Sequence, residues 1–157
     1  MAVVPYSPQP ERLAALCEAW RARCQAGPAR ARQSFHLSVG TCLNWRGHPL
    51  QARADLAQAR ALADGFADHG ALINVTHQGL RNALLLGDTD AAMAAADACQ
   101  QAVRAGGYGS SFAQHAQAAQ VLVGVAAGRP ARVLAALHAL QREAEDAASP
   151  ADAEVAA

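Results

Sequence analysis

Apolar residues recur three or four positions apart along most of the chain, which is the spacing of a helix with one buried face. One stretch shows how such a segment ends and the next begins. An apolar run ends at Trp45-Arg46-Gly47, the chain turns at His48-Pro49, and apolar positions return on one helical face at Ala52, Leu56 and Ala59. Glycine ends helices in the left-handed conformation, and proline fits the first turn of the next helix. The stretch therefore predicts two helices joined by a tight turn.

Breaks of this kind recur along the whole chain at a spacing close to twenty residues. Valine and isoleucine are scattered, so no run of residues is typical of a strand. The pattern predicts an all-α fold of seven helices. We expect them over residues 9–26, 29–46, 49–66, 70–86, 89–105, 111–127 and 130–147.

Three of the breaks mark equivalent points of a repeat, since Gly47, Gly87 and Gly128 lie 40 and 41 residues apart. A fixed period in this range is typical of stacked helical hairpins, each of which needs its neighbours to bury its apolar face. We therefore expect a single domain over residues 1–148, in which a capping helix precedes three hairpins and a flexible tail follows. The capping helix is expected at 8–27, the hairpins at 28–66, 70–106 and 110–147, and the tail at 149–157.

The first hairpin resembles a tetratricopeptide (TPR) repeat in the spacing of its small and large residues. The positions that carry the resemblance are Gly40, Leu43, Gly47, Ala52, Leu56 and Ala59. The second hairpin keeps Gly87, Ala92 and Ala96, with Gly79 one residue out of register, and the third keeps Gly128 with Val133, Leu137 and Leu140. The resemblance implies a right-handed solenoid of antiparallel hairpins.

The period of about 40 residues exceeds the 34 of an ordinary TPR repeat, so the helices are longer. In this respect the chain is similar to the long hairpins of bacterial regulatory and signalling proteins, such as the helical sensor domains of LuxR/MalT-type activators. HEAT-like or other helical hairpins are the alternatives.

The composition limits the classes of partner. Hydrophobic residues make up 52% of the chain and aromatic residues 4%, a mixture rich in alanine that suits closely packed helices. Thirteen arginines balance thirteen acids, which argues against general binding to nucleic acid or to a membrane surface. The sequence shows no signal peptide and no membrane-spanning run, so we expect a cytoplasmic protein with reduced cysteines.

In TPR proteins the first helix of each hairpin lines the ligand-binding groove. The resemblance therefore implies a partner-binding set on the three first helices, made up of Ser34, Ser38, Thr41, Asn44, Asn74, His77, Gln78, Arg81, Ser111 and His115. Asn74, His77, Gln78 and Arg81 follow the helical spacing i, i+3, i+4, i+7, so they form one stripe. These helices contain no Asp or Glu, and arginine donates a planar fork of hydrogen bonds to carboxylates. Such a face can accept a carboxylate or an acidic peptide, and an ordinary solvated polar face is the alternative.

The chemistry-bearing residues do not predict an enzyme. No Gly-x-Ser-x-Gly motif occurs, and no cysteine stands beside a base at a catalytic spacing. None of the six histidines has a partner at the i, i+4 spacing of a metal site, although His77 and His115 are expected to face each other across neighbouring helices. We predict no catalytic residues, no metal and no cofactor.

The leading functional prediction is a protein–protein interaction module. A small chaperone for a secreted or assembly client and a regulatory domain that binds a small anionic ligand are the alternatives. Self-association is a further prediction, because the apolar run Val121 to Ala127 has few polar neighbours.

Overall fold

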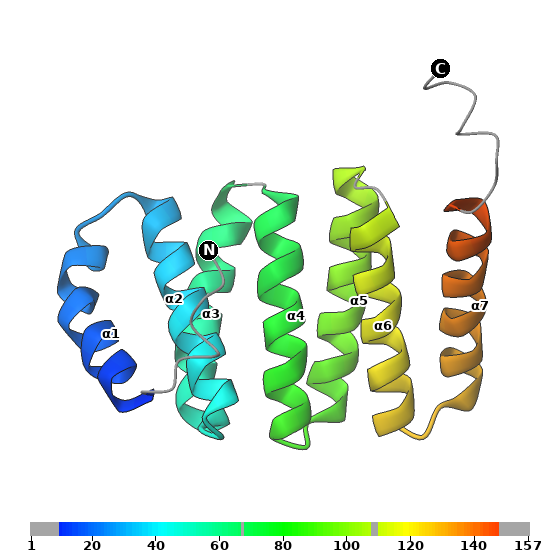
Figure 1. Ribbon diagram of the computed structural model, residues 1–157, viewed down its shortest axis with the longest axis horizontal. Helices are drawn as coiled ribbons and strands as arrows, with labels where there is room; N and C mark the ends of the chain where they lie inside the picture. The colour runs from blue at the N-terminus through cyan, green and yellow to red at the C-terminus, as the bar shows by residue number, and fades with distance from the viewer. Residues whose placement is uncertain (1–9, 67, 108–109, 148–157) are drawn as a thin grey trace.

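The computed structural model describes residues 10–66, 68–107 and 110–147, and every regular element in this part of the chain is an α-helix (Figure 1). There are seven of them. They are α1 (Pro10–Gln25), α2 (Ala29–Trp45), α3 (Pro49–Phe66), α4 (His69–Leu85), α5 (Thr89–Gly106), α6 (Ser110–Ala126) and α7 (Pro130–Ala147). The predicted fold class and number of helices are confirmed, and each helix begins and ends within one residue of its expected position. The expected tail, 149–157, lies outside the described residues.

The three equivalent turns share one hydrogen-bond pattern. Gly47, Gly87 and Gly128 have φ of 76°, 72° and 62°, in the left-handed region that glycine enters without steric cost. Each glycine N–H donates to the carbonyl three residues before it. The next residue donates to the carbonyl five residues before it, from His48 to Leu43, Asp88 to Ala83 and Arg129 to Gly124. This is the Schellman motif, and its threefold recurrence confirms that the turns are equivalent.

Among the described residues, the other ends of the helices do not share this hydrogen-bond pattern, and two helices begin at an aspartate. Asp68 begins α4 by accepting a hydrogen bond from the Ala71 N–H at 3.0 Å. This bond lowers the pKa of Asp68. Asp88 caps α5 in the same way through the Ala91 N–H, again at 3.0 Å. Both aspartates satisfy N–H groups that have no partner within their own helix.

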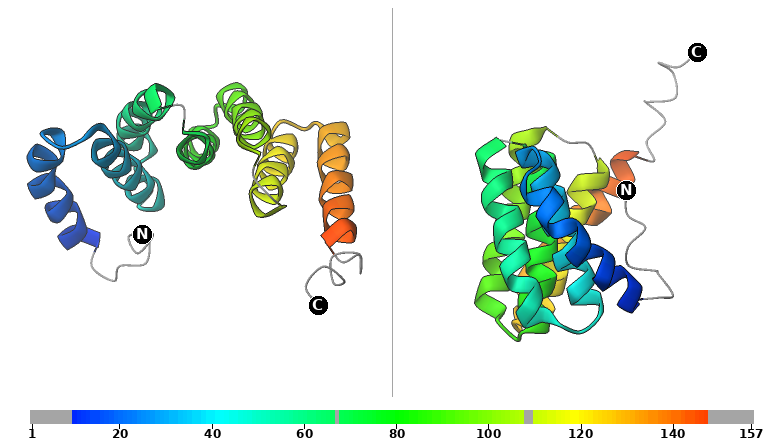
Figure 2. Two further views of the ribbon diagram at one scale, coloured as in Figure 1. Left: turned by 90° about the horizontal axis from the view of Figure 1, so that it is seen from above. Right: turned by 90° about the vertical axis from the view of Figure 1, so that its left-hand side faces the viewer.

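The helices pack in sequence as hairpins, with α2 on α3, α4 on α5 and α6 on α7, while α1 packs on α2. The first helices of the hairpins also contact each other, α2 with α4 and α4 with α6, whereas α3 and α5 make no comparable contact among the described residues. Seen from above, α3 and α5 lie along one side of the row and the first helices along the other (Figure 2). The two ends of the row, α1 and α7, turn toward the side of the first helices, so α2, α4 and α6 lie on the inner side of the row (Figure 2).

Alanine dominates the core, since ten of the nineteen buried apolar side chains in the described residues are alanines. Such small side chains let the helix backbones approach closely. Gly40 shows how close, because a Cβ placed there would lie 2.6 Å from Cγ of Leu56. Gly124 plays the same part in the third hairpin, 2.8 Å from Cγ2 of Val133. The larger core side chains, such as Leu80 and Val123, gather where α4, α5 and α6 meet.

Candidate functional site

Three of the four partner-binding residues predicted on α2, Ser34, Ser38 and Thr41, lie along one side of the helix, which we call the α2 stripe. Ser34 is exposed, while Ser38 and Thr41 are partly exposed, and the Thr41 hydroxyl donates to the Leu37 carbonyl at 2.7 Å. At 100° per residue the stripe continues at Trp45, which sequence reasoning left out, and not at Asn44. Trp45 is 46% exposed. The spacing 34, 38, 41, 45 was visible in the sequence and would have identified it.

Asn44 serves the packing of the hairpins. It is buried, its side-chain amide donates to the Gln78 carbonyl at 3.4 Å, and its oxygen accepts from Asn82 at 2.7 Å. Asn82 also donates to the Pro49 carbonyl at 2.7 Å, so this buried pair ties the first hairpin to the second. We therefore leave Asn44 out of the partner-binding set.

The stripe on α4 lies beside the stripe on α2. The Arg81 guanidinium lies 4.6 Å from the centre of the Trp45 ring, which is a cation–π contact between the two helices. Asn74, one end of the stripe, is exposed and donates to the Gly70 carbonyl at 3.1 Å. His77 and Gln78 lie between them and are partly buried. The structure thus brings all four predicted residues of α4 onto one side.

His77 of α4 and His115 of α6 meet edge to face, with ring centres 5.7 Å apart. Burial lowers the pKa of His77 below its usual value, and the neighbouring His115 and Arg81 lower it further. Nδ1 of His77 and Oε1 of Gln78 are buried without a hydrogen-bond partner among the described residues. Ser111 lies in the first turn of α6, but its side chain is outside the part of the chain that the structure describes.

Each of the first helices, α2, α4 and α6, carries large exposed apolar residues at its turn end. They are Trp45 on α2, Leu85 on α4, and Leu122 with Val125 on α6, with exposed fractions of 46%, 55%, 50% and 67%. The first helices all run in the same direction, so these residues lie toward the same end of the molecule (Figure 1). We call them the apolar band. Exposed apolar groups that gather on one face are typical of interaction sites.

A charged cluster joins α1 to the first hairpin. Asp55 of α3 is buried, and its Oδ1 lies 2.7 Å from Nδ1 of His36 and 3.3 Å from Nη1 of Arg21. Arg21 also pairs with Glu18, at 3.0 Å. The cluster could not be predicted from the sequence because its members come from three helices. Its contacts satisfy a buried carboxylate, which is a structural role.

Three of the four cysteines do not resemble activated nucleophiles. Burial raises the pKa of the Cys17, Cys42 and Cys99 thiols, and therefore disfavours the thiolate that nucleophilic attack requires. Within the described residues, no three of the His, Cys, Asp and Glu side chains stand together in a way that would hold a metal ion.

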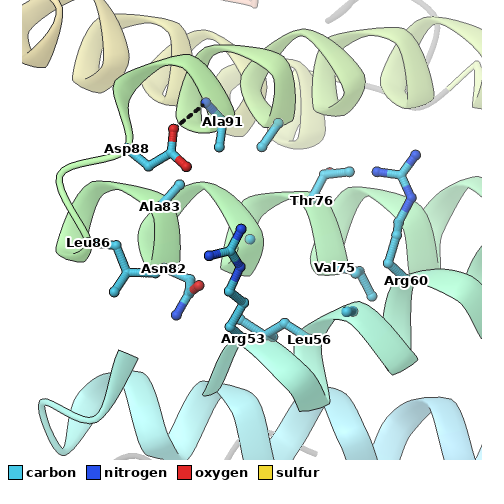
Figure 3. A pocket seen from close by; sticks show the side chains of 13 residues that line it. Arg53, Leu56, Arg60, Val75, Thr76, Asn82, Ala83, Leu86, Asp88 and Ala91 are labelled. Atoms are coloured by element: carbon cyan, nitrogen blue, oxygen red, sulfur yellow. Dashed lines mark hydrogen bonds between the residues drawn. The ribbon is translucent and has the colours of Figure 1, made fainter. Parts of the chain in front are cut away.

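A hollow of about 240 Å³ opens on the other side of α4, between α3 and α5 (Figure 3). Arg53, Leu56, Ala57 and Arg60 of α3 form one wall, and Asp88, Ala91 and Ala95 form the other. The floor consists of Val75, Thr76, Gly79, Asn82, Ala83 and Leu86. This hollow could not be predicted from the sequence, since the residues that line it come from three different helices and the turn between two of them.

None of the described helices has the length and apolar character needed to cross a membrane. Comparisons with protein-family models, with curated proteins and with solved structures found no match to this chain.

Proposed function

We propose that the chain is a TPR-like protein-interaction module that binds a partner segment across its first helices, α2, α4 and α6. The observation that carries the proposal is the apolar band, which lies at the turn end of each of these helices. An amphipathic segment would cover the band with its apolar residues and meet the stripes with its polar ones. The right-handed stacking of a TPR solenoid belongs to the same proposal.

The charges favour a partner with acidic groups. None of the first helices carries Asp or Glu, and Arg81 is held by Trp45 at the junction of stripe and band. An arginine stacked on an aromatic ring keeps its N–H groups directed outward for a carboxylate. Because exposed ion pairs are screened by salt, binding should weaken as ionic strength rises.

A second copy of the chain is another candidate partner, for which α7 provides an observation. Leu134 and Leu137 are 55% and 45% exposed on this last helix. Terminal units of stacked repeats usually carry a polar outer face, because an apolar one promotes association. Analytical ultracentrifugation of wild type and Leu134→Ser would test this contact separately from partner binding.

The test of the proposed function is affinity capture from the source cell with four forms of the chain: wild type, two variants and a matched control. One variant carries Leu85→Ser and Leu122→Ser, and the other Asn74→Ala, His77→Ala and Arg81→Ala. We expect each variant to retain about a tenth or less of the captured partner, since a few central contacts carry most of the affinity of an interface. The matched control carries Gln58→Ala and Gln101→Ala, both exposed on α3 and α5. Equal capture by all forms would contradict the proposal.

A further inference from the structure

We infer that the hollow between α3 and α5 is a second binding site, which takes an amphipathic helix of a partner protein bearing acidic residues on one edge. This site is separate from the surface of the proposed function. Residues 75, 79, 82 and 86 of its floor lie on the side of α4 opposite to the stripe of Asn74, His77 and Arg81. The same helix therefore supports two surfaces that face different directions.

The shape of the hollow suits a helix. Its floor runs along α4 from Val75 to Leu86, a length of about 16 Å or three helical turns. Its volume of about 240 Å³ lies below the roughly 300–1,000 Å³ usual for small-molecule sites. A trough of this length between two helices matches the helix-in-groove mode of recognition, in which an apolar side chain fills the deepest point.

Gly79 lies in the middle of this floor. A Cβ placed there would meet no atom within 4 Å, so the absence of a side chain leaves open space in the middle of the floor. This glycine differs from Gly40, which is required for helix packing. The walls carry short side chains on both sides of the hollow, namely Ala57, Ala91 and Ala95. The backbone of an incoming helix can therefore approach closely.

The charged residues that line the hollow determine which edge of the partner helix must carry the acidic residues. Arg53 and Arg60 stand on the α3 wall (Figure 3). Arg53 has no hydrogen-bond or ion-pair partner among the described residues, while Arg60 uses its Nε to bind Asp64 at 3.0 Å and leaves its terminal nitrogens for other contacts. Asp88 on the other wall would repel a carboxylate on that side. The partner's acids must therefore face α3.

The spacing of the two arginines predicts the pattern in the partner. They are two turns apart on α3, about 10 Å along the helix axis. A partner helix alongside α3 would match them with acids at positions i and i+7. An apolar residue at i+3 or i+4 would then lie between the acids and point toward Gly79.

The experiment is selection of helical peptides from a displayed random library against the immobilised full-length chain, with salt near the physiological level. We expect the enriched clones to carry two acids seven residues apart with an apolar residue between them. Their affinity should fall at least about tenfold for Gly79→Leu, which fills the hollow, and about tenfold for Arg53→Gln with Arg60→Gln. Urea unfolding of each variant verifies that it is folded.

Leu85→Ser with Leu122→Ser is the control, and it should leave the affinity of these clones unchanged. Enrichment of clones without the acidic pair, or of clones that bind Gly79→Leu as well as wild type, would overturn the inference. Loss of binding to the Leu85→Ser, Leu122→Ser control would assign the peptides to the surface of the proposed function instead. Self-association that disappears in Gly79→Leu would make a second copy the occupant, which would also overturn it.

Discussion

The histidine at position 77 has an environment that makes its protonation costly. Its ring is partly buried, it meets the ring of His115, and Arg81 lies one turn further along α4. The pKa of His77 is therefore lower in the folded chain than in the unfolded chain, where it is about 6.5. Below about pH 6.5 the unfolded chain binds the proton more readily, so this group lowers the stability of the fold as pH falls.

Removal of this imidazole should make the fold less sensitive to acid. We expect the melting temperature of wild type to fall more between pH 7.5 and pH 5.5 than that of His77→Gln, by a difference on the order of 2 °C. Thermal unfolding followed by circular dichroism measures it. His138→Gln, at an exposed position of α7, is the control and should behave like wild type. An equal fall for His77→Gln and wild type would show that His77 is not protonated differently in the two states.

Single residues also show how much of the geometry of the candidate site follows from the sequence. The spacing of Asn74, His77, Gln78 and Arg81 predicted one stripe, and the contact between His77 and His115 was expected before the structure was known. Asn44, which the resemblance places in the partner-binding set, is buried and bonds to Gln78 and Asn82, whereas the helical angle places Trp45 on the exposed side of α2. Asp55 was missed since its partners, His36 and Arg21, lie on other helices.

At the scale of the helix, two glycines in similar segments have opposite roles. A Cβ at Gly40 would approach the Leu56 side chain to 2.6 Å, while a Cβ at Gly79 would meet nothing within 4 Å. Both lie inside helices, where alanine is favoured over glycine by about 0.5–1 kcal/mol. At Gly40 the steric cost of a Cβ exceeds the stability gained from alanine's higher helix propensity. At Gly79 no steric contact offsets that gain.

Alanine substitutions should therefore change stability in opposite directions. We expect Gly40→Ala to lower the free energy of unfolding by about 1–3 kcal/mol. Gly79→Ala should raise it by about 0.5–1 kcal/mol. Urea denaturation of the two variants measures both. A stabilised Gly40→Ala variant would mean that α2 and α3 do not approach each other as closely as described.

The elements themselves were predictable because the signals are local. Glycine at a Schellman turn and proline at a helix start act within a few residues, so the sequence predicted every helix to within one residue. The hollow was not predictable in this way. The hollow depends on how α3 and α5 both pack on α4. The one feature of the sequence that marks it is Gly79, which is out of register with the repeat.

At the scale of the whole molecule, the row of helices offers a different surface on each side. The inner side carries the polar stripes and the apolar band of α2, α4 and α6. The outer side carries the hollow between α3 and α5, with its two arginines (Figure 3). A chain with both surfaces could hold two partner segments at once, because α4 alone separates them.

Binding of a partner along the inner side is the central claim, and site-specific photo-crosslinking tests it most directly. A benzophenone amino acid would replace Leu85 or Leu122 in the apolar band, or Gln58 on the outer side of α3, in the source cell. We predict that positions 85 and 122 cross-link to the same protein, identified by mass spectrometry, and that position 58 does not. Cross-links from position 58 alone, or unrelated products from positions 85 and 122, would contradict the account.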